Sequence, residues 1–291
     1  MTTVEQDAHA YYFDLRDKVP SGGGGALAYI RRATADPRRA NPVTIAQFAL
    51  GALQHRDPSL DVAVTVAVDW VESWVEPDGS LPYRFAMPHT FPLAAPWTSA
   101  LAQGEAASLL LRAAAVLDRP ELVELARHLA APLLATGSPL AVETSEGPVL
   151  QEYPTSPPAH VLNGWITALW GLHDVGTGYG GHEGEPEAEA AFVAGTDALE
   201  KRLHLYRTYR RWSRYDLFPH PLPNVASPSY HLLHVGHLRA LHDLAPRAVF
   251  ASTADEWEQS GRDARSRAVA VARKGAFRIL RPRGRMVEVA A

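Results

Sequence analysis

The chain has 291 residues, 46% of them hydrophobic, which is enough to bury a full core as one large domain or two smaller ones. Its formal net charge of −4 excludes a general electrostatic attraction to nucleic acid, so a polyanionic ligand would need a local basic patch. The chain contains no cysteine, which excludes disulfides and thiolate metal sites.

The N-terminal residues predict an arm on a soluble protein. They lack a basic segment followed by an apolar one, and no apolar run is long enough to span a membrane. We therefore expect a cytoplasmic protein without a membrane partner. The glycines of SGGGG, residues 21–25, predict a flexible link that sets residues 1–25 apart as the N-terminal arm.

Helical periodicity dominates the rest of the chain. It predicts helices at about 41–55, 59–76, 98–117, 120–136, 158–174, 187–206, 228–244 and 253–271. Short extended pieces between them, such as LPYRFAM, PVLQEYP and SRYDLFP, predict small β hairpins in the loops. The last segment, residues 276–291, alternates weakly and predicts a strand or a C-terminal tail.

The predicted helices form four pairs, which indicates a repeat. The first helix of each pair begins near a proline and a Ser, Thr or Asn, the residues that favour a helix N-terminus. The first helices are apolar around most of their surface, which predicts burial, and the second helices are more charged. Buried first helices and outer second helices predict a mainly α protein, with an α/α toroid of the incomplete (α/α)4 type over residues 26–275.

In such a ring the polar loops before the first helices converge at one end, where a ligand site is expected. Aromatic rings beside acids suit a sugar, because a ring face covers apolar C–H bonds while acids bind hydroxyls. The convergent loops offer Tyr83, Arg84, Trp97, Gln103, Glu152, Tyr153, Arg214, Tyr215, Asp216, Tyr230 and His231. His231, His234 and His237 form a stripe on one helix. Without a motif such as H-E-x-x-H, the first two are better substrate donors than metal ligands.

Several of these residues also have ordinary structural readings. Tyr153 and Tyr215 could be capping or packing residues with a wet hydroxyl, and Glu152 could be an ion-pair partner. Asp216 is better suited to holding a loop or an arginine than to acting as a base. The basic run KRLHLYRTYRRWSR could be a solvated helix end or could guide an anionic glycan.

Five sequence blocks, in order over roughly residues 11–245, resemble the C-terminal domain of the glucuronyl C5-epimerase family. EYPTSPPAHVLNGWITALWGLHD is similar to its EEYPT…VLNG…GL.DL segment, and PWTSALAQGEAASLLLRAA to its aromatic–x–S-A-M-A-Q-G-x-A block. NPVTIAQFALG, RYDL and SYHLLHVGHLRAL resemble its I-A-Q-Y-G-L, Y-D-L-R-H and Y-H-x-x-H blocks. In this chain Phe218 and Pro219 replace the arginine and histidine after Y-D-L, and the β-rich regions before the helical domain are missing or shrunken.

The family inverts C5 of glucuronate within a polysaccharide and so produces iduronate. The resemblance implies that its catalytic glutamate corresponds to Glu152 and the adjacent tyrosine to Tyr153. The tyrosines of the Y-D-L and Y-H blocks correspond to Tyr215 and Tyr230. It further implies a heparosan-like polymer as substrate, no redox cofactor and a homodimer. A structural calcium ion is left open, because its oxygen ligands leave little trace in a sequence.

The chemistry explains why such residues are needed. The C5–H bond of a uronate lies beside a carboxylate and is very weakly acidic, so inversion needs a base on one face and an acid on the other. Glu152 and Tyr230, on separate loops, could flank the sugar. Charge developing on the carboxylate needs donors such as Arg84, Arg214 or a phenol. The expected substrate-binding residues are Tyr83, Arg84, Trp97, Gln103, Arg214, His231 and His234.

Three other functions fit the same residues. A uronate lyase shares the proton abstraction at C5 and then eliminates the substituent at O4. A glycoside hydrolase on the same helical scaffold would use Glu152 and Asp216 as its carboxyl pair. A carbohydrate-binding protein without catalysis is the third alternative.

Overall fold

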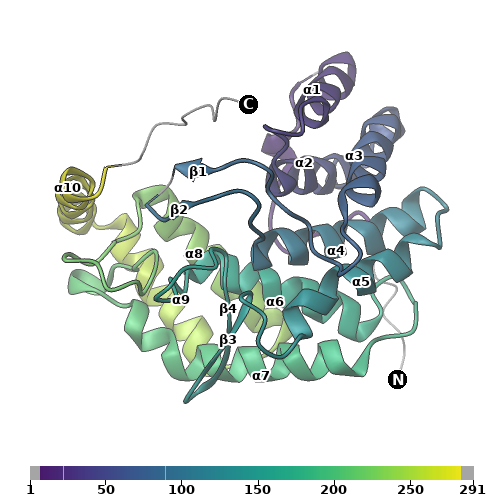
Figure 1. Ribbon diagram of the computed structural model, residues 1–291. Coiled ribbons are helices and arrows are strands. Elements are labelled where there is room, and N and C mark those ends of the chain that lie inside the picture. Colours follow the sequence, from purple (N-terminus) through teal and green to yellow (C-terminus); the bar gives the residue numbers. More distant parts are fainter. Residues whose placement is uncertain (1–6, 22, 89, 283–291) are drawn as a thin grey trace.

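The computed structural model describes residues 7–21, 23–88 and 90–282 (Figure 1). These residues are mainly helical, as predicted, with two short antiparallel hairpins. In the first hairpin β1 (Met87–Pro88) pairs with β2 (Pro92–Leu93), and in the second β3 (Ala141–Thr144) pairs with β4 (Gly147–Leu150). Within the described residues, no helix combines the length and apolar character needed to cross a bilayer.

Four helices form an inner series, largely buried except for α8, and four more pack on them from outside. The inner helices are α2 (Pro42–Gln54), α4 (Ala100–Val116), α6 (Leu162–Thr177) and α8 (Pro228–Leu244). The outer helices are α3 (Asp61–Trp74), α5 (Leu122–Leu134), α7 (Pro186–Arg202) and α9 (Ala248–Arg262). Each outer helix contacts its own inner partner, and the inner helices contact one another in chain order. The predicted pairs of inner and outer helices are therefore confirmed.

The N-terminal ends of α2 and α8 show the capping that the sequence predicts, whereas Ser99 before α4 and Val161 before α6 form no side-chain cap. Asn41 precedes α2, and its side chain accepts a hydrogen bond from the backbone N–H of Thr44. Ser227 precedes α8 and accepts from the backbone N–H of Tyr230. These caps satisfy N–H groups that the first helical turn leaves unpaired, and they fix where each helix begins.

The closest helix contact in the core is the crossing of α4 and α6. A Cβ atom added to Gly171 would lie 2.3 Å from the Cα of Gly104, so the two backbones meet directly. Almost every residue of α4 is buried, and Trp165 and Trp170 of α6 are fully buried, as expected of core residues. The small residues of these helices thus allow an approach that a larger side chain would prevent.

The N-terminal arm packs against the inner helices rather than standing apart. The rings of Tyr11, Tyr12 and Phe13 lie against Trp170. The Tyr12 hydroxyl donates to Asp174 at 2.5 Å. The same carboxylate pairs at 2.6 Å with Arg112, whose Nε donates to the carbonyl of Ala10. This buried network joins the arm to α4 and α6.

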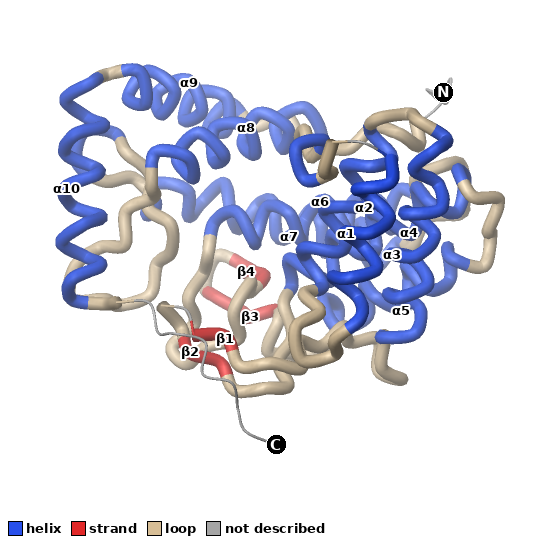
Figure 2. Tube along the Cα trace, turned by 90° about the horizontal axis from the view of Figure 1, so that it is seen from above, coloured by secondary structure: helices blue, strands red, loops and turns tan. Residues whose placement is uncertain are grey.

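Two sequence predictions about the ends of the chain are wrong. The predicted flexible link continues into α1 (Gly23–Ala35), because that helix packs on α2 and α3. The predicted helix at 253–271 is two helices, α9 and α10 (Ala264–Leu280), since Asp263 breaks the first and caps the second (Figure 2). The segment from residue 276, predicted as a strand or tail, is helical to Leu280. Residues 283–291 lie outside the described residues.

Candidate active site

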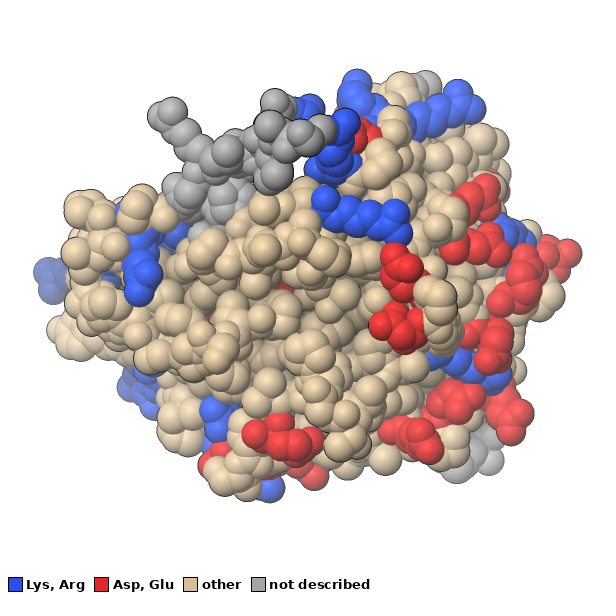
Figure 3. All heavy atoms as spheres, in the orientation of Figure 1, with Lys and Arg blue, Asp and Glu red and all other residues tan. Residues whose placement is uncertain are grey.

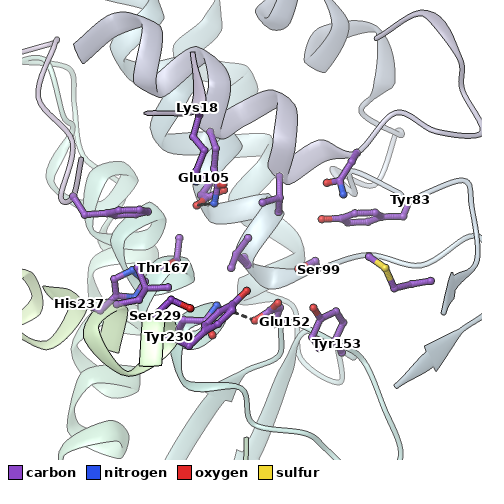
Figure 4. Close-up of a pocket in the computed structure, with 18 of the residues that line it drawn as sticks. Lys18, Tyr83, Ser99, Glu105, Glu152, Tyr153, Thr167, Ser229, Tyr230 and His237 are labelled. Carbon is purple, nitrogen blue, oxygen red and sulfur yellow. Dashed lines mark hydrogen bonds between the residues drawn. The ribbon is translucent and has the colours of Figure 1, made fainter. Parts of the chain in front are cut away.

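A cleft of about 460 Å³ lies where the loops before the inner helices meet, as their predicted convergence requires (Figure 4). Its walls come from the N-terminal arm, the four inner helices and the loops that precede them. The lining residues are Phe13, Lys18, Asn41, Val43, Gln47, Tyr83, Met87, Trp97, Ser99, Leu101, Glu105, Glu152, Tyr153, Asn163, Thr167, Ser229, Tyr230, Leu233 and His237.

Glu152 is the acidic group that the sequence places in this site. It follows the β3–β4 hairpin, and the neighbouring Gln151 is fixed because its carbonyl accepts from the backbone N–H of Ala100. The carboxylate accepts a hydrogen bond from the Nδ2 of Asn163 at 3.2 Å (Figure 4). Burial raises the pKa of Glu152 to about 7, although hydrogen bonds with Tyr153, Asn163 and Tyr215 favour its charged form. The carboxyl group can therefore accept or release a proton near neutrality.

Three tyrosines surround Glu152. Tyr153 and Tyr230 line the cleft, whereas Tyr215 lies behind them with its ring perpendicular to that of Tyr230 at 5.1 Å. Tyr153 and Tyr215 are almost fully buried, and burial raises the pKa of each phenol well above its ordinary value. Tyr230 is 38% exposed at the start of α8, so of the three its hydroxyl is the most accessible to a ligand.

An aromatic wall forms a further side of the cleft. Tyr83 and Trp97 stack with their ring centroids 3.8 Å apart, and their backbones form an antiparallel bridge. The Trp97 Nε1 donates to the carbonyl of Phe85 at 3.0 Å, which fixes the orientation of the indole. Both residues line the cleft where the sequence predicts sugar contacts, and Trp97 also borders an outer groove of about 780 Å³.

Five of the seven predicted substrate-binding residues do not line the cleft: Arg84, Gln103, Arg214, His231 and His234. Gln103 is fully buried, accepts from the backbone N–H of Leu81, and donates to the carbonyls of Gly79 and Leu129. It holds the loop after α3 against α4 and α5, and both of its N–H donors are used. Arg84 borders the outer groove, where it pairs with a surface glutamate at 2.7 Å.

The remaining predicted polar contacts lie behind the cleft wall. The Nε2 of His231 donates to the carbonyl of Trp257, and Ser213 bridges the Nδ1 atoms of His231 and His234. Burial lowers the pKa of His231 to about 4, so this pair is a neutral structural network. The third histidine of the stripe, His237, is the one that lines the cleft. Arg214 contributes no lining atom.

Asp216 holds a loop, as one sequence reading expects. Its fully buried carboxylate accepts from the side chain of Asn224 at 2.5 Å and from the backbone N–H of Phe218 at 3.2 Å. It does not line the cleft, so it is not positioned beside a bound sugar with Glu152. The carboxyl pair of the glycoside hydrolase reading is therefore not assembled.

The sequence analysis missed two charged residues of the cleft, Glu105 and Lys18. Glu105 is fully buried on α4, and burial raises the pKa of its carboxyl to about 8. An acidic residue within the otherwise apolar run LAQGEAASLLL could have indicated this site, because unpaired acids are rarely buried. No comparable signal marks Lys18, which reaches the cleft from the N-terminal arm. Among the described residues, no three His, Asp or Glu side chains gather as a metal site would require.

Comparison with known proteins identifies a matching family and a similar protein. The family model described as D-glucuronyl C5-epimerase C-terminus matches residues 76–259, which include Glu152, Tyr153, Tyr215 and Tyr230. The D-glucuronyl C5-epimerase of Caenorhabditis elegans is 31% identical over 182 residues, covering 55% of this chain and 28% of that protein. The chain thus corresponds to less than a third of the length of this relative.

Proposed function

The chain belongs to the D-glucuronyl C5-epimerase C-terminal family, and we propose that it inverts C5 of D-glucuronate to L-iduronate within a heparosan-like polysaccharide. The observation that supports this best is the placement of Glu152 in a cleft beside Tyr153 and Tyr230, with the stacked aromatic wall of Tyr83 and Trp97. A carboxyl group with a pKa of about 7 is matched to proton transfer at neutral pH.

The reaction needs two proton transfers on opposite faces of the sugar. In one direction Glu152 takes the C5 proton, and the electron pair of the broken C–H bond delocalises into the adjacent carboxylate. Tyr230 then gives its phenolic proton to C5 from the other face, which inverts the centre. Proton exchange with solvent restores both groups, and the reverse reaction exchanges their roles. The chemistry is redox-neutral and needs no redox cofactor.

Tyr153 and Tyr215 serve Glu152 in this proposal. Both form hydrogen bonds with its carboxylate, which favour the ionised form against the effect of burial. Their own phenols stay neutral, because burial and the charge of Glu152 oppose ionisation. They therefore orient the base, while the accessible Tyr230 exchanges protons with the sugar. Tyr83 and Trp97, stacked on each other, form the aromatic side of the cleft that a pyranose would contact.

We propose an incomplete α/α toroid as the architecture that carries this site. It is supported by the chain-order contacts between inner helices and by the outer helix on each of them. Residues 26–275 would form the catalytic domain, with an arm and a tail at either end. The homodimer, the cytoplasmic location and a structural calcium ion stay predictions.

The test is incubation with unsulfated glucuronate–N-acetylglucosamine polymer in D₂O, followed by NMR at C5. We expect deuterium at C5 together with iduronate signals. Ultraviolet absorbance of an unsaturated uronate would instead identify a lyase, and new reducing ends would identify a hydrolase. Intact polymer without exchange, across a panel of uronate polymers, would overturn the epimerase proposal.

A further inference from the structure

The proposed substrate carries a carboxylate on the sugar that reacts, but the cations expected to bind it are engaged elsewhere. Arg84 pairs with Glu76 at the outer groove, and Arg214 does not line the cleft. Among the described residues, Lys18 is the one lysine or arginine in the cleft lining, where its ammonium also forms a solvent-exposed pair with Asp17 at 3.3 Å. Exposed pairs of this kind are weak, so a substrate carboxylate can replace Asp17. The face seen in Figure 3 has few charged side chains in its middle, so a uronate is not held there by a broad basic surface.

Glu105 lies close enough to Lys18 for electrostatic interaction and has an unsatisfied oxygen. Its Oε1 accepts a hydrogen bond from the Nε2 of Gln47 at 2.9 Å. Its Oε2 is buried and has no hydrogen-bond partner among the described residues, and Glu105 is one of the residues that line the cleft. Buried polar atoms are normally paired in folded proteins, so an unpaired carboxyl oxygen in a cleft indicates a ligand that completes it.

The two residues lie together on one side of the cleft. Figure 4 shows the side chain of Lys18 extending from the arm toward Glu105, with Glu152 and Tyr230 across the open space. A sugar between these groups would present its C5 to Glu152 and Tyr230 and its carboxylate to Lys18 and Glu105. The arm that carries Lys18 is fixed to the helices by Tyr12 and Asp174, so the ammonium group is supplied by an anchored segment.

We propose that Lys18 and Glu105 form the recognition site for the carboxylate of the reacting uronate. The ammonium of Lys18 pairs with one oxygen, and Glu105, as a neutral carboxylic acid, donates its O–H to the carboxylate. This inference rests on the proposed function, because it assumes that a uronate occupies the cleft. It assigns substrate selection to Lys18, which lies in none of the five family blocks, and to Glu105, which occupies the unspecified position of the S-A-M-A-Q-G-x-A block.

The electrostatic environment supports the neutral form of Glu105. Burial, together with the charge of Glu152, raises its pKa to about 8 against the opposing effects of the Gln47 hydrogen bond and of Lys18. An ionised Glu105 would repel a uronate, whereas the neutral acid is a donor. During proton removal at C5, negative charge grows on the carboxylate oxygens, so both donors would stabilise the transition state more than the ground state.

The test compares binding of two polymers. One is the unsulfated glucuronate–N-acetylglucosamine polymer, and the other is its carboxyl-reduced form, in which glucose replaces glucuronate. For Lys18→Met we expect affinity for the uronate polymer to fall about 10- to 100-fold, since charge-assisted hydrogen bonds are lost. Affinity for the carboxyl-reduced polymer should not change. Calorimetry gives both values, and melting temperatures check the fold.

Arg16→Met is the matched control. Arg16 is two residues away on the same arm, pairs with Asp14 at 2.6 Å and does not line the cleft. Its removal should leave both affinities unchanged. Glu105→Gln keeps a neutral donor and should retain most of the binding, whereas Glu105→Leu should lose it for the uronate polymer alone.

Each result decides for or against the site. The inference is overturned if Lys18→Met binds the uronate polymer like wild type, loses both polymers equally, or if wild type does not distinguish the polymers. The same holds if Glu105→Gln and Glu105→Leu are equally impaired. If wild type binds the uronate polymer better than its carboxyl-reduced form but exchanges no proton at C5, the proposed function is wrong and the recognition site is supported. If wild type exchanges the C5 proton and Lys18→Met exchanges it equally well, the proposed function stands and the recognition site is overturned.

Discussion

Gly164 and Glu152 are in such close contact that a Cβ atom on Gly164 would lie 2.4 Å from the Cβ of Glu152 and 2.6 Å from its Oε2. Gly164 belongs to the first turns of α6, so the helix backbone itself forms the surface on which the carboxylate rests. The sequence V-L-N-G therefore supplies both Asn163, which donates to Glu152, and the space in which that carboxylate sits.

Replacing Gly164 by alanine should inactivate the protein by displacing Glu152. A shift of about 1 Å in a catalytic group can reduce turnover about 100-fold, and we expect a loss of at least that size. The measurement is the rate of deuterium incorporation at C5. Gly236→Ala is the control, because nothing lies within 4 Å of the added methyl on α8. It should keep full activity and gain about 0.5–1 kcal/mol of stability.

Glu152→Gln should abolish C5 exchange while leaving polymer binding within a few-fold of wild type. The amide preserves shape but cannot take a proton, and general acid–base groups contribute about 10²–10⁴-fold in rate. Exchange rates and calorimetric affinity measure the two effects. Glu143→Gln, on the exposed part of the hairpin before Glu152, should change neither. Turnover equal to wild type in Glu152→Gln would refute the role of Glu152.

Tyr230→Phe removes one hydroxyl and keeps the ring that packs against Tyr215. We expect a fall in epimerisation of about 100-fold or more with an unchanged melting temperature, because the second face of the sugar loses its proton donor. The exposed Tyr209, outside the cleft, provides the control Tyr209→Phe. Exchange measured separately from glucuronate and iduronate polymers should show unequal losses. Equal, undiminished exchange in both would exclude Tyr230 from proton transfer.

The pH profile of kcat/KM should have a maximum between the pKa values of two carboxyl groups. Activity should rise as Glu152 ionises near pH 7, since only the carboxylate acts as a base. It should fall as Glu105 loses its proton near pH 8 and begins to repel the substrate carboxylate. Glu105→Gln should keep the rising limb and lose this falling limb. A profile that is identical in the two proteins would contradict the neutral role of Glu105.

The same carboxyl group should make the fold less stable at higher pH. The pKa of Glu105 is raised from 4.5 to about 8 in the folded protein, so its contribution is complete below pH 4.5 and is lost as pH rises toward 8. Between pH 4.5 and 7 the loss is on the order of 3 kcal/mol. Urea unfolding of wild type and Glu105→Gln at several pH values measures it. We expect the variant to have the flatter dependence, and parallel curves would rule out the shift.

The helices were predictable from the sequence because their signals are local. Apolar periodicity and the caps at Asn41 and Ser227 mark where inner helices begin. Two helix boundaries were not predicted, because they depend on tertiary packing or on a single residue. Helix α1 begins in a glycine run that disfavours a helix by itself, and it forms where it packs on α2 and α3. The break between α9 and α10 comes from a single capping residue, Asp263, within a continuous helical pattern.

The sequence predicted which loops form the site, but not which of their side chains point into it. Position before an inner helix correctly brought Glu152, Tyr153 and Tyr230 to one cleft. It could not give side-chain direction, so Gln103 and His231 were placed in the cleft although they bond to backbone and neighbours behind it. The place of Lys18 in the cleft could not be predicted for another reason. Its place depends on long-range packing of the arm, which no local pattern encodes.

The crossing of α4 and α6 at Gly104 and Gly171 has a consequence for engineering this protein. Helix α4 carries Glu105, and α6 carries Asn163, which holds Glu152, so the distance between the two acids follows from where these backbones touch. One methyl group at either glycine would separate the helices and both halves of the site with them. Libraries meant to alter polymer preference should therefore vary the cleft surface and exclude these two positions.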